Sequence, residues 1–207
     1  YDSNRPFLIA MLRKLNVEVR DFGCIPDDEA KIEDTFHKAA NECDAIITSG
    51  GVSVGEADFT GDVLHRIGDV TFYKVAVKPG KPFAFGTIND AVFFGLPGNP
   101  VSTALTFHQL VLPILRHMAG EVTDEALLLR ATTVTDLKKR PGRTDFQRGV
   151  LSVGEGGELL VEAIKSQSSG AFTSMLHANC FIRLEQEQGA VAKGEVVRVV
   201  LFDKWLQ

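Results

Sequence analysis

The sequence predicts an α/β domain with a mostly parallel sheet over residues 1–120, followed by a small all-β, barrel-like domain over residues 124–207. In the first part, stretches with apolar residues at helical spacing alternate with short apolar runs, an order typical of a parallel sheet covered by helices. After Gly120 the helical spacing stops, and short β-rich runs separated by Gly, Pro, Asp and Ser predict a barrel or a sandwich. A chain of 207 residues is long enough to give each part its own core.

Composition excludes several classes of protein. The formal net charge of -5 argues against a general nucleic-acid binder, so any bound anion has to be met by a local group of cations. No apolar run approaches the roughly 20 residues that span a bilayer, so we expect no membrane segment. The three cysteines are odd in number and lack metal-type spacing, which favours a reducing, cytoplasmic environment. The five histidines are scattered and form no metal-binding pattern.

The first helix is predicted over the stretch "YDSNRPFLIAMLRKL", with Asp2 or Ser3 as its cap. Four apolar residues at helical spacing predict its buried face: Leu8, Met11, Leu12 and Leu15. The alternating run "VEVRDFG" then predicts a strand over residues 17–23. Position 1 is not Met and the chain opens on a helix, so we expect a piece of a longer protein.

A second helix is predicted after Pro26, with Asp27 or Asp28 as its cap and with acidic residues in its first turn, as the helix dipole favours. The next predicted strand, "DAIITS", runs directly into Gly50 and Gly51. Tight strand-to-helix turns account for most Gly-Gly pairs, but adjacent glycines also let a ligand approach the backbone closely. Ligands of open α/β sheets bind beyond the carboxyl ends of strands, where Asp27 and the two glycines are all expected to lie.

Three short strands are predicted within residues 70–100, joined by the turns "KPGKP" and "TIND". Lys74 and Lys78 are expected to share a face, because side chains alternate along a strand, and Lys81 follows across the Pro-Gly turn. No acidic residue lies between Lys74 and Lys81. The three lysines therefore form either an anion site or a set of solvated surface cations.

The longest helix is predicted to begin at Pro100, after "GLPGNP", because proline sacrifices no hydrogen bond in the first helical turn. The free amide groups of that turn would favour a negative group. Asn99 is either a simple helix cap or part of the site. Pro113, inside the same helix, predicts a kink or an irregular turn.

The second domain carries a basic turn and a loop of small residues. The run "KKRPGRTDFQRG" concentrates Lys138, Lys139, Arg140, Arg143 and Arg148, and "KSQSSGAF" offers small hydroxyl groups. Basic turns on small barrels are mostly solvated, so the turn is either an exposed surface feature or part of an anion site.

Four motifs in this order, "TSGGVSVGEADFT", "KPGKPFAFG", "GLPGNPVSTALTF" and "PGRTDFQRG", resemble the molybdopterin molybdenumtransferases of the MoeA family. The resemblance is to the carboxyl-terminal half of that family and covers essentially the whole chain; the enzymatic domain of the scaffold protein gephyrin is a relative. The first motif alone would also suit molybdopterin adenylyltransferases, whereas "KPGKPFAFG" followed by a β-rich domain points to the molybdenumtransferase. Adenylyl transfer and a gephyrin-like, non-enzymatic scaffold are the alternatives.

The resemblance implies a role in molybdenum cofactor biosynthesis, in which molybdate is inserted into adenylylated molybdopterin with release of AMP and with the help of Mg²⁺. The catalytic residues implied by the matching motifs are Asp27, Asp58 and Lys78, with Asp27 and Asp58 at the metal. The implied molybdate ligands are Lys78, Lys81, Arg148 and Ser169. The implied substrate-binding residues are Gly50, Gly51, Ser53, Lys74, Pro97, Asn99 and Pro100.

The resemblance also implies partners. Family members act as homodimers whose active site is completed by amino-terminal domains of the partner subunit, so we expect these 207 residues to be inactive on their own. Two further domains, and a strand before the first helix, belong to the family pattern but not to this sequence. A molybdopterin adenylyltransferase is the implied functional partner, and neither nucleic acid nor a membrane is expected.

Overall fold

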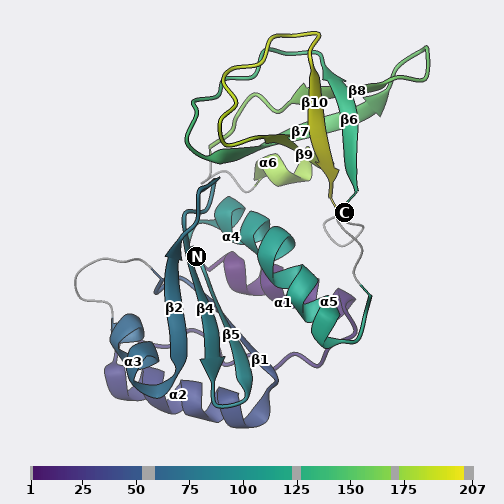
Figure 1. Ribbon diagram of the computed structural model, residues 1–207. Coiled ribbons are helices and arrows are strands. Elements are labelled where there is room, and N and C mark those ends of the chain that lie inside the picture. The colour runs from purple at the N-terminus through teal and green to yellow at the C-terminus, as the bar shows by residue number, and fades with distance from the viewer. Residues whose placement is uncertain (1, 53–58, 123–126, 169–172, 203–207) are drawn as a thin grey trace. The chain divides into compact units, whose positions relative to one another are not determined.

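The computed structural model describes residues 2–52, 59–122, 127–168 and 173–202, and its chain divides into two compact units (Figure 1). The first unit is Tyr1–Val75 with Gly80–Glu121, and the second is Ala76–Pro79 with Val122–Gln207. An α/β first unit and a strand-dominated second unit confirm the predicted fold class. The four residues Ala76–Pro79 belong to the second unit, although the sequence analysis placed them in the first domain.

The sheet of the first unit contains, in spatial order, β1 (Ala45–Ser49), β5 (Ala91–Leu96), β4 (Pro82–Ile88) and β2 (Asp69–Lys74). β1 and β5 are parallel, but β5 with β4 and β4 with β2 are antiparallel. The sheet is therefore mixed and not mostly parallel as predicted. The short links explain the difference, because residues 89–90 and 75–81 cannot form the crossover of about a dozen residues that a parallel pair requires.

Helices α1 (Asn4–Lys14), α2 (Glu29–Glu42) and α3 (Phe59–Ile67) belong to the first unit. α2 and α3 share one core with the sheet, and its buried members are Ile32, Phe36, Ala39, Ile46, Val52, Val63, Leu64, Val70, Ala84, Ile88, Ala91 and Phe93. On α1, Leu8 and Met11 are buried as predicted, whereas Leu12 and Leu15 are only half-buried. No helix in the described parts of the chain is long and apolar enough to cross a membrane.

The predicted long helix is a continuous helical run of three segments: α4 (Pro100–Thr106), a π-helical turn (Phe107–Val111) and α5 (Leu112–Met118). Pro113 lies in the first turn of α5. A proline has no N–H for the preceding turn and its ring crowds the carbonyl there, and the wider π-helical turn absorbs both effects. The irregularity predicted from Pro113 is therefore confirmed.

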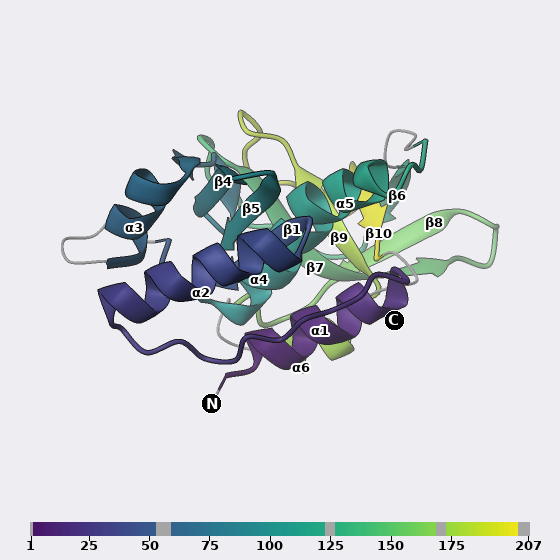
Figure 2. The same ribbon diagram turned by 90° about the horizontal axis from the view of Figure 1, so that it is seen from below.

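Residues 17–23 do not form the predicted strand. Figure 2 shows the segment as a plain coil leading from the end of α1 back to the start of α2. β1 pairs only with β5 within the described residues, and a groove of about 1530 Å³ is lined by both β1 and this segment. An extended segment without a neighbour at hydrogen-bonding distance has no ladder to join, so alternation alone did not produce a strand.

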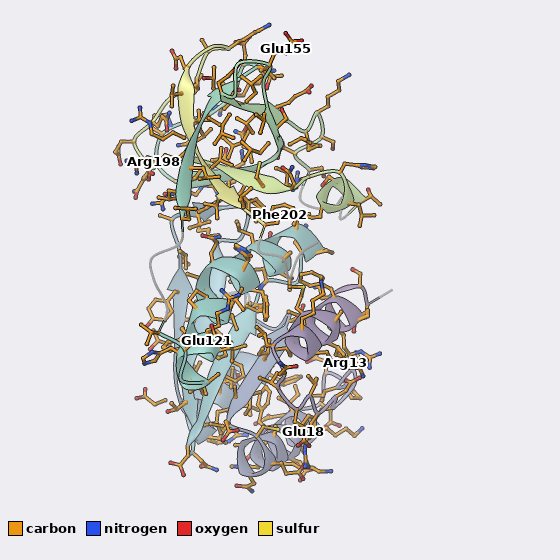
Figure 3. The ribbon with its side chains drawn as sticks, turned by 90° about the vertical axis from the view of Figure 1, so that its right-hand side faces the viewer. Arg13, Glu18, Glu121, Glu155, Arg198 and Phe202 are labelled. Atoms are coloured by element: carbon orange, nitrogen blue, oxygen red, sulfur yellow. The ribbon has the colours of Figure 1, made fainter. Side chains whose placement is uncertain are left out.

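The second unit is a closed five-stranded barrel. Its strands follow one another around the barrel in the order β7 (Thr144–Val153), β8 (Leu159–Ala163), β6 (Leu128–Thr133), β10 (Val196–Leu201) and β9 (Cys180–Leu184), and β9 pairs again with β7. Closure removes the exposed sheet edges that would otherwise invite aggregation. A short helix, α6 (Thr173–Leu176), and Phe202, whose ring centroid lies 4.6 Å from that of Phe181, complete the unit (Figure 3).

A sixth strand, β3 (Val77–Lys78), enters the barrel unit from the first part of the chain. It runs parallel to β7, with Val77 opposite Thr144 and Lys78 opposite Asp145. The N–H of Thr144 donates to the carbonyl of Ala76 at 2.9 Å. The residues on either side of this segment lie close together, because the N–H of Val75 donates to the carbonyl of Lys81 at 2.8 Å.

Candidate functional site

The turn after β1 contains Gly50 and Gly51, and its geometry explains both glycines. Gly50 and Gly51 have φ values of +89° and +67°, a region that other residues rarely adopt. A Cβ atom on Gly51 would lie 2.9 Å from Oγ1 of Thr60, whereas a Cβ on Gly50 would meet nothing within 4 Å. Gly51 is therefore required by turn geometry and packing, and the open space beside Gly50 is where a ligand could approach the backbone. Ser53 and Asp58, which follow in the same motif, lie outside the described residues.

Asn4 ties this turn to the end of β5. Its Nδ2 atom donates to Oγ of Ser49 at 2.7 Å and to the carbonyl of Gly98 at 2.8 Å. Only 8% of Asn4 is exposed. The sequence analysis missed this residue, although a signal exists: Asn4 occupies the same helical stripe as Leu8 and Met11, so it is a polar residue on a buried face.

Asp27 and Asp28 have separate roles in the structure. Asp28 is the N-cap of α2, where its Oδ1 accepts the N–H of Lys31 at 3.1 Å, and this hydrogen bond lowers the pKa of Asp28. Asp27 is exposed, and no hydrogen bond or ion pair joins its carboxylate to another described residue. Asp28 therefore takes the capping role, and the Asp27 carboxylate is available to a ligand.

One groove in the first unit is lined by four of the predicted site residues: Asp27, Gly50, Gly51 and Pro100. Asn4 and Thr48 line it too, and Oγ1 of Thr48 is buried without a hydrogen-bond partner among the described residues. The groove therefore combines an available carboxylate and hydroxyl with an open stretch of backbone.

The loop between β5 and α4 is held by Thr103. Its Oγ1 donates to the carbonyl of Pro97 at 2.6 Å and to that of Asn99 at 2.9 Å. Asn99 occupies the N-cap position of α4, but its side chain makes no capping hydrogen bond, and Pro100 is the first helical residue. Simple capping therefore does not explain the asparagine side chain.

The three predicted lysines belong to different units. Lys74 and Lys81 are exposed at one end of the β2–β4 hairpin, where Lys74 lies opposite Pro82. Lys78 belongs to β3 and hence to the second unit, whereas the sequence analysis counted it with residues 1–120. The cause is the ladder that Val77 and Lys78 form with β7.

In the second unit, Lys78 contacts a carboxylate that the sequence analysis did not single out. Its Nζ lies 3.3 Å from Oδ2 of Asp145, and the two side chains are 55% and 6% exposed. Nε2 of Gln147 donates to the same oxygen at 3.2 Å. Asp145 was detectable as the residue three places before Arg148 in the "TDFQRG" motif, but its pairing depends on the register of β3, which the sequence does not reveal.

Arg148 is 1% exposed and lies on β7. Its Nη2 donates to the carbonyls of Ser166 at 3.1 Å and Ser168 at 3.3 Å, and its Nε is buried without a hydrogen-bond partner among the described residues. Burial lowers the pKa of Arg148, and the nearby charge of Asp145 acts in the opposite direction. By strand alternation Arg148 projects from the opposite face of β7 to Asp145. Ser169 lies outside the described residues.

Residues 1–117 match the family described as the probable molybdopterin binding domain, and residues 130–202 match the MoeA C-terminal region, domain IV. The chain belongs to the MoeA family. The molybdopterin molybdenumtransferase of Haemophilus influenzae is 47% identical over 207 residues, which are 100% of this chain and 51% of that protein. Gephyrin of Dictyostelium discoideum is 32% identical over 232 residues, which cover 97% of this chain and 32% of that protein.

Solved structures agree with the assignment to the MoeA family. The crystal structure of the molybdopterin biosynthesis moeA protein from Pyrococcus horikoshii OT3 matches with a TM-score of 0.76 at 26% identity, covering 98% of this chain and 46% of that one. The chain spans about half the length of the molybdenumtransferases of Haemophilus influenzae and Staphylococcus aureus, which it matches with 47% and 30% identity.

Proposed function

We propose that this chain forms part of a molybdopterin molybdenumtransferase, which inserts molybdate into adenylylated molybdopterin and releases AMP. The observation that carries the proposal is the match along the whole chain. The molybdopterin-binding match and the MoeA C-terminal match follow each other, and 47% identity to a named molybdenumtransferase extends over all 207 residues. The second match favours molybdenum transfer over adenylyl transfer, because it covers the β-rich unit that distinguishes the two readings of the sequence.

The pterin phosphate is proposed to bind in the groove of the first unit. Support comes from the open space beside Gly50 and from the Asp27 carboxylate in the same groove. The N–H of Gly50 already donates to the carbonyl of Leu96 at 3.0 Å, so Gly50 gives the ligand room beside the chain and not a donor. Gly51, Ser53, Pro97, Asn99 and Pro100 complete the proposed substrate-binding set, and Lys74 would neutralise phosphate charge.

Molybdate is proposed to bind through Lys78, Lys81, Arg148 and Ser169. Arg148 supports this role, because no carboxylate among the described residues is hydrogen-bonded to it, and a buried guanidinium in that state gains most from a bound oxyanion. Asp145 fixes the ammonium group of Lys78 at one end, and a lysine ammonium has two further N–H groups for a ligand. Lys78 would act on the reacting anion and would thus be the catalytic cation.

Magnesium is proposed as the cofactor, held by Asp27 and Asp58. The described residues include no cluster of three or more His, Cys, Asp or Glu side chains. Mg²⁺ is usually held by one or two carboxylates together with waters and substrate phosphates, and Asp27 is an available carboxylate of that kind. When bound, the ion would neutralise phosphate charge, and the part of Asp27 would be to hold it beside the groove.

The longer protein is proposed to be a cytoplasmic homodimer that receives its substrate from a molybdopterin adenylyltransferase. The charge of -5 and the exposed thiol of Cys24 are compatible with this setting, and neither nucleic acid nor a membrane has a part in the proposal.

A chimaera tests the proposed function. These 207 residues would replace the matching half of the Haemophilus influenzae relative, and AMP release and molybdenum incorporation would be measured with adenylylated molybdopterin. We expect both activities, and we expect Lys78→Ala and Arg148→Ala to reduce them while Lys38→Ala, an exposed change on α2, leaves them intact. AMP release that does not depend on molybdate, or full activity of both site variants, would contradict the proposal.

A further inference from the structure

Residues 138–143 concentrate positive charge on a protein of the opposite sign. Their sequence, "KKRPGR", contains four cations and no acid, whereas the whole chain has a net charge of -5. Lys138, Arg140 and Arg143 are exposed, and Lys139 is buried. We call residues 138–143 the basic loop.

The exposed cations of the basic loop differ from most arginines elsewhere in the chain. Arg5, Arg20, Arg66, Arg116, Arg183 and Arg198 each lie within 4.0 Å of a carboxylate oxygen. No ion pair within the described residues involves Lys138, Arg140 or Arg143. Two acids flank the loop along the chain: Asp136, whose Oδ1 accepts the N–H of Lys193 at 2.8 Å, and Asp145, which is buried and already engaged by Lys78 and Gln147. The exposed charges of Lys138, Arg140 and Arg143 therefore face solvent without an ion-pair partner among the described residues.

The backbone of the basic loop is fixed at several points. Nζ of Lys139 donates to the carbonyls of Arg140 at 3.1 Å and Gln186 at 3.3 Å. The N–H of Gly142 donates to the same Gln186 carbonyl at 2.8 Å, and Nε2 of Gln147 donates to the carbonyl of Lys138 at 2.9 Å. A loop that is already ordered loses less conformational entropy when it binds a ligand.

The basic loop ends beside the strand that carries Lys78. Thr144 directly follows Arg143, and its N–H donates to the carbonyl of Ala76 at 2.9 Å. Lys78 lies opposite Asp145 on the neighbouring strand. Within the second unit, Lys78, which is proposed to bind molybdate, thus lies close to the end of the basic loop.

We propose that the basic loop binds the phosphate groups of a small anionic ligand through Arg140 and Arg143, next to Lys78. Arginine favours phosphate, because its planar fork of N–H groups matches two phosphate oxygens at once. In naming that ligand the inference rests on the proposed function, whose substrate carries a pyrophosphate. The loop would then raise the local concentration of the substrate and guide it toward the oxyanion site.

The test compares two double variants that each remove two positive charges from the second unit. Arg140→Gln with Arg143→Gln changes the basic loop, and Arg130→Gln with Arg198→Gln changes an exposed, like-charged pair that lies opposite on β6 and β10. Arg198 is labelled in Figure 3. Affinity of the 207-residue chain for inorganic pyrophosphate would be measured by calorimetry at low and moderate salt.

We expect the loop variant to bind pyrophosphate about tenfold more weakly than the unaltered chain, and its affinity to change less with salt concentration. The affinity of the control variant should stay within about twofold of that of the unaltered chain. Equal losses in both variants, or no pyrophosphate binding by the unaltered chain, would overturn the inference. An oligonucleotide that bound more tightly than pyrophosphate through the same arginines would assign the loop to nucleic acid and would also overturn it. Molybdate titration of Lys78→Ala tests the proposed function separately, because that residue lies outside the loop.

Discussion

Replacing Asn4 by Ala should destabilise the first unit, because one side chain holds the ends of two strands. The substitution removes two hydrogen bonds, to Oγ of Ser49 at 2.7 Å and to the carbonyl of Gly98 at 2.8 Å. A hydrogen bond of this kind contributes about 1 kcal/mol net. Two of them give an expected loss of about 2 kcal/mol in the free energy of unfolding, with no added burial penalty because Ser49 and Gly98 are exposed and water can replace the lost donor.

Asn4→Asp sharpens the test, because it keeps the volume and removes the donor. The ionised carboxylate can accept the hydroxyl of Ser49 but faces the carbonyl oxygen of Gly98, so at pH 7 this variant should be no more stable than Asn4→Ala. Stability should partly return at acidic pH, where the protonated carboxyl can donate once. Asn41→Ala, an exposed change on α2, is the matched control.

Urea denaturation followed by circular dichroism at 222 nm measures both variants, since α1 to α5 all belong to the first unit. The reasoning fails if Asn4→Ala costs no more than the Asn41→Ala control. It also fails if Asn4→Asp is as stable as the unaltered chain at pH 7, because the hydrogen bonds that Asn4 donates would then contribute nothing to the free energy of unfolding.

Three further outcomes are expected. Gly50→Ala should lower the free energy of unfolding by about 1 kcal/mol, because alanine disfavours the left-handed backbone. Gly51→Ala should lower it by roughly 1 to 3 kcal/mol more than Gly50→Ala does, because its Cβ would also overpack. Equal unfolding midpoints of the two variants in urea would contradict this. Lys81→Ala should weaken molybdate binding, and the unaltered chain should lose affinity as salt rises, because exposed charges are screened within about 10 Å at 0.1 M; an unchanged calorimetric affinity would remove Lys81 from the site. Burial raises the pKa of the Cys180 thiol to about 12, so at pH 8 iodoacetamide should modify exposed Cys24 and spare Cys180, as mass spectrometry of the folded chain would report; equal labelling would refute the buried assignment.

Local chemistry predicted those elements whose signals are local. Asp28 caps α2 through the amide three residues on, and Pro113 disturbs the helix around its own position. Each of these effects acts within one turn of the chain, so neighbouring residues are enough to anticipate it. The change from helical to strand-rich texture near Gly120 likewise needed only composition.

Long-range pairing decided the rest. Residues 17–23 alternate like a strand, but a strand also needs a neighbour, and alternation does not say whether one is present. The register of β3 against β7 assigns Lys78 to the second unit, while Lys74 and Lys81 belong to the first, although all three stand within eight residues. Asn4 and Asp145 acquire their partners 94 and 67 positions away, respectively, which a single sequence does not disclose.

For the candidate site, the family resemblance implied the groove residues Asp27, Gly50, Gly51 and Pro100, which all line one groove of the first unit. Arg148 is buried against the carbonyls of Ser166 and Ser168, a setting that composition did not suggest, because basic turns are usually solvated. The roles of these residues stay predictions until ligands are tested.

The passage of Ala76–Pro79 through the barrel sheet makes the two units poor modules for recombination. A cut after Glu121 would give the second part its five barrel strands but would strip β7 of Val77 and Lys78. The N–H of Thr144 would lose its acceptor, and the Asp145 carboxylate would lose its cation. Gene fusion or domain exchange at that boundary would therefore transplant an incomplete barrel, and the two regions are expected to be inherited together.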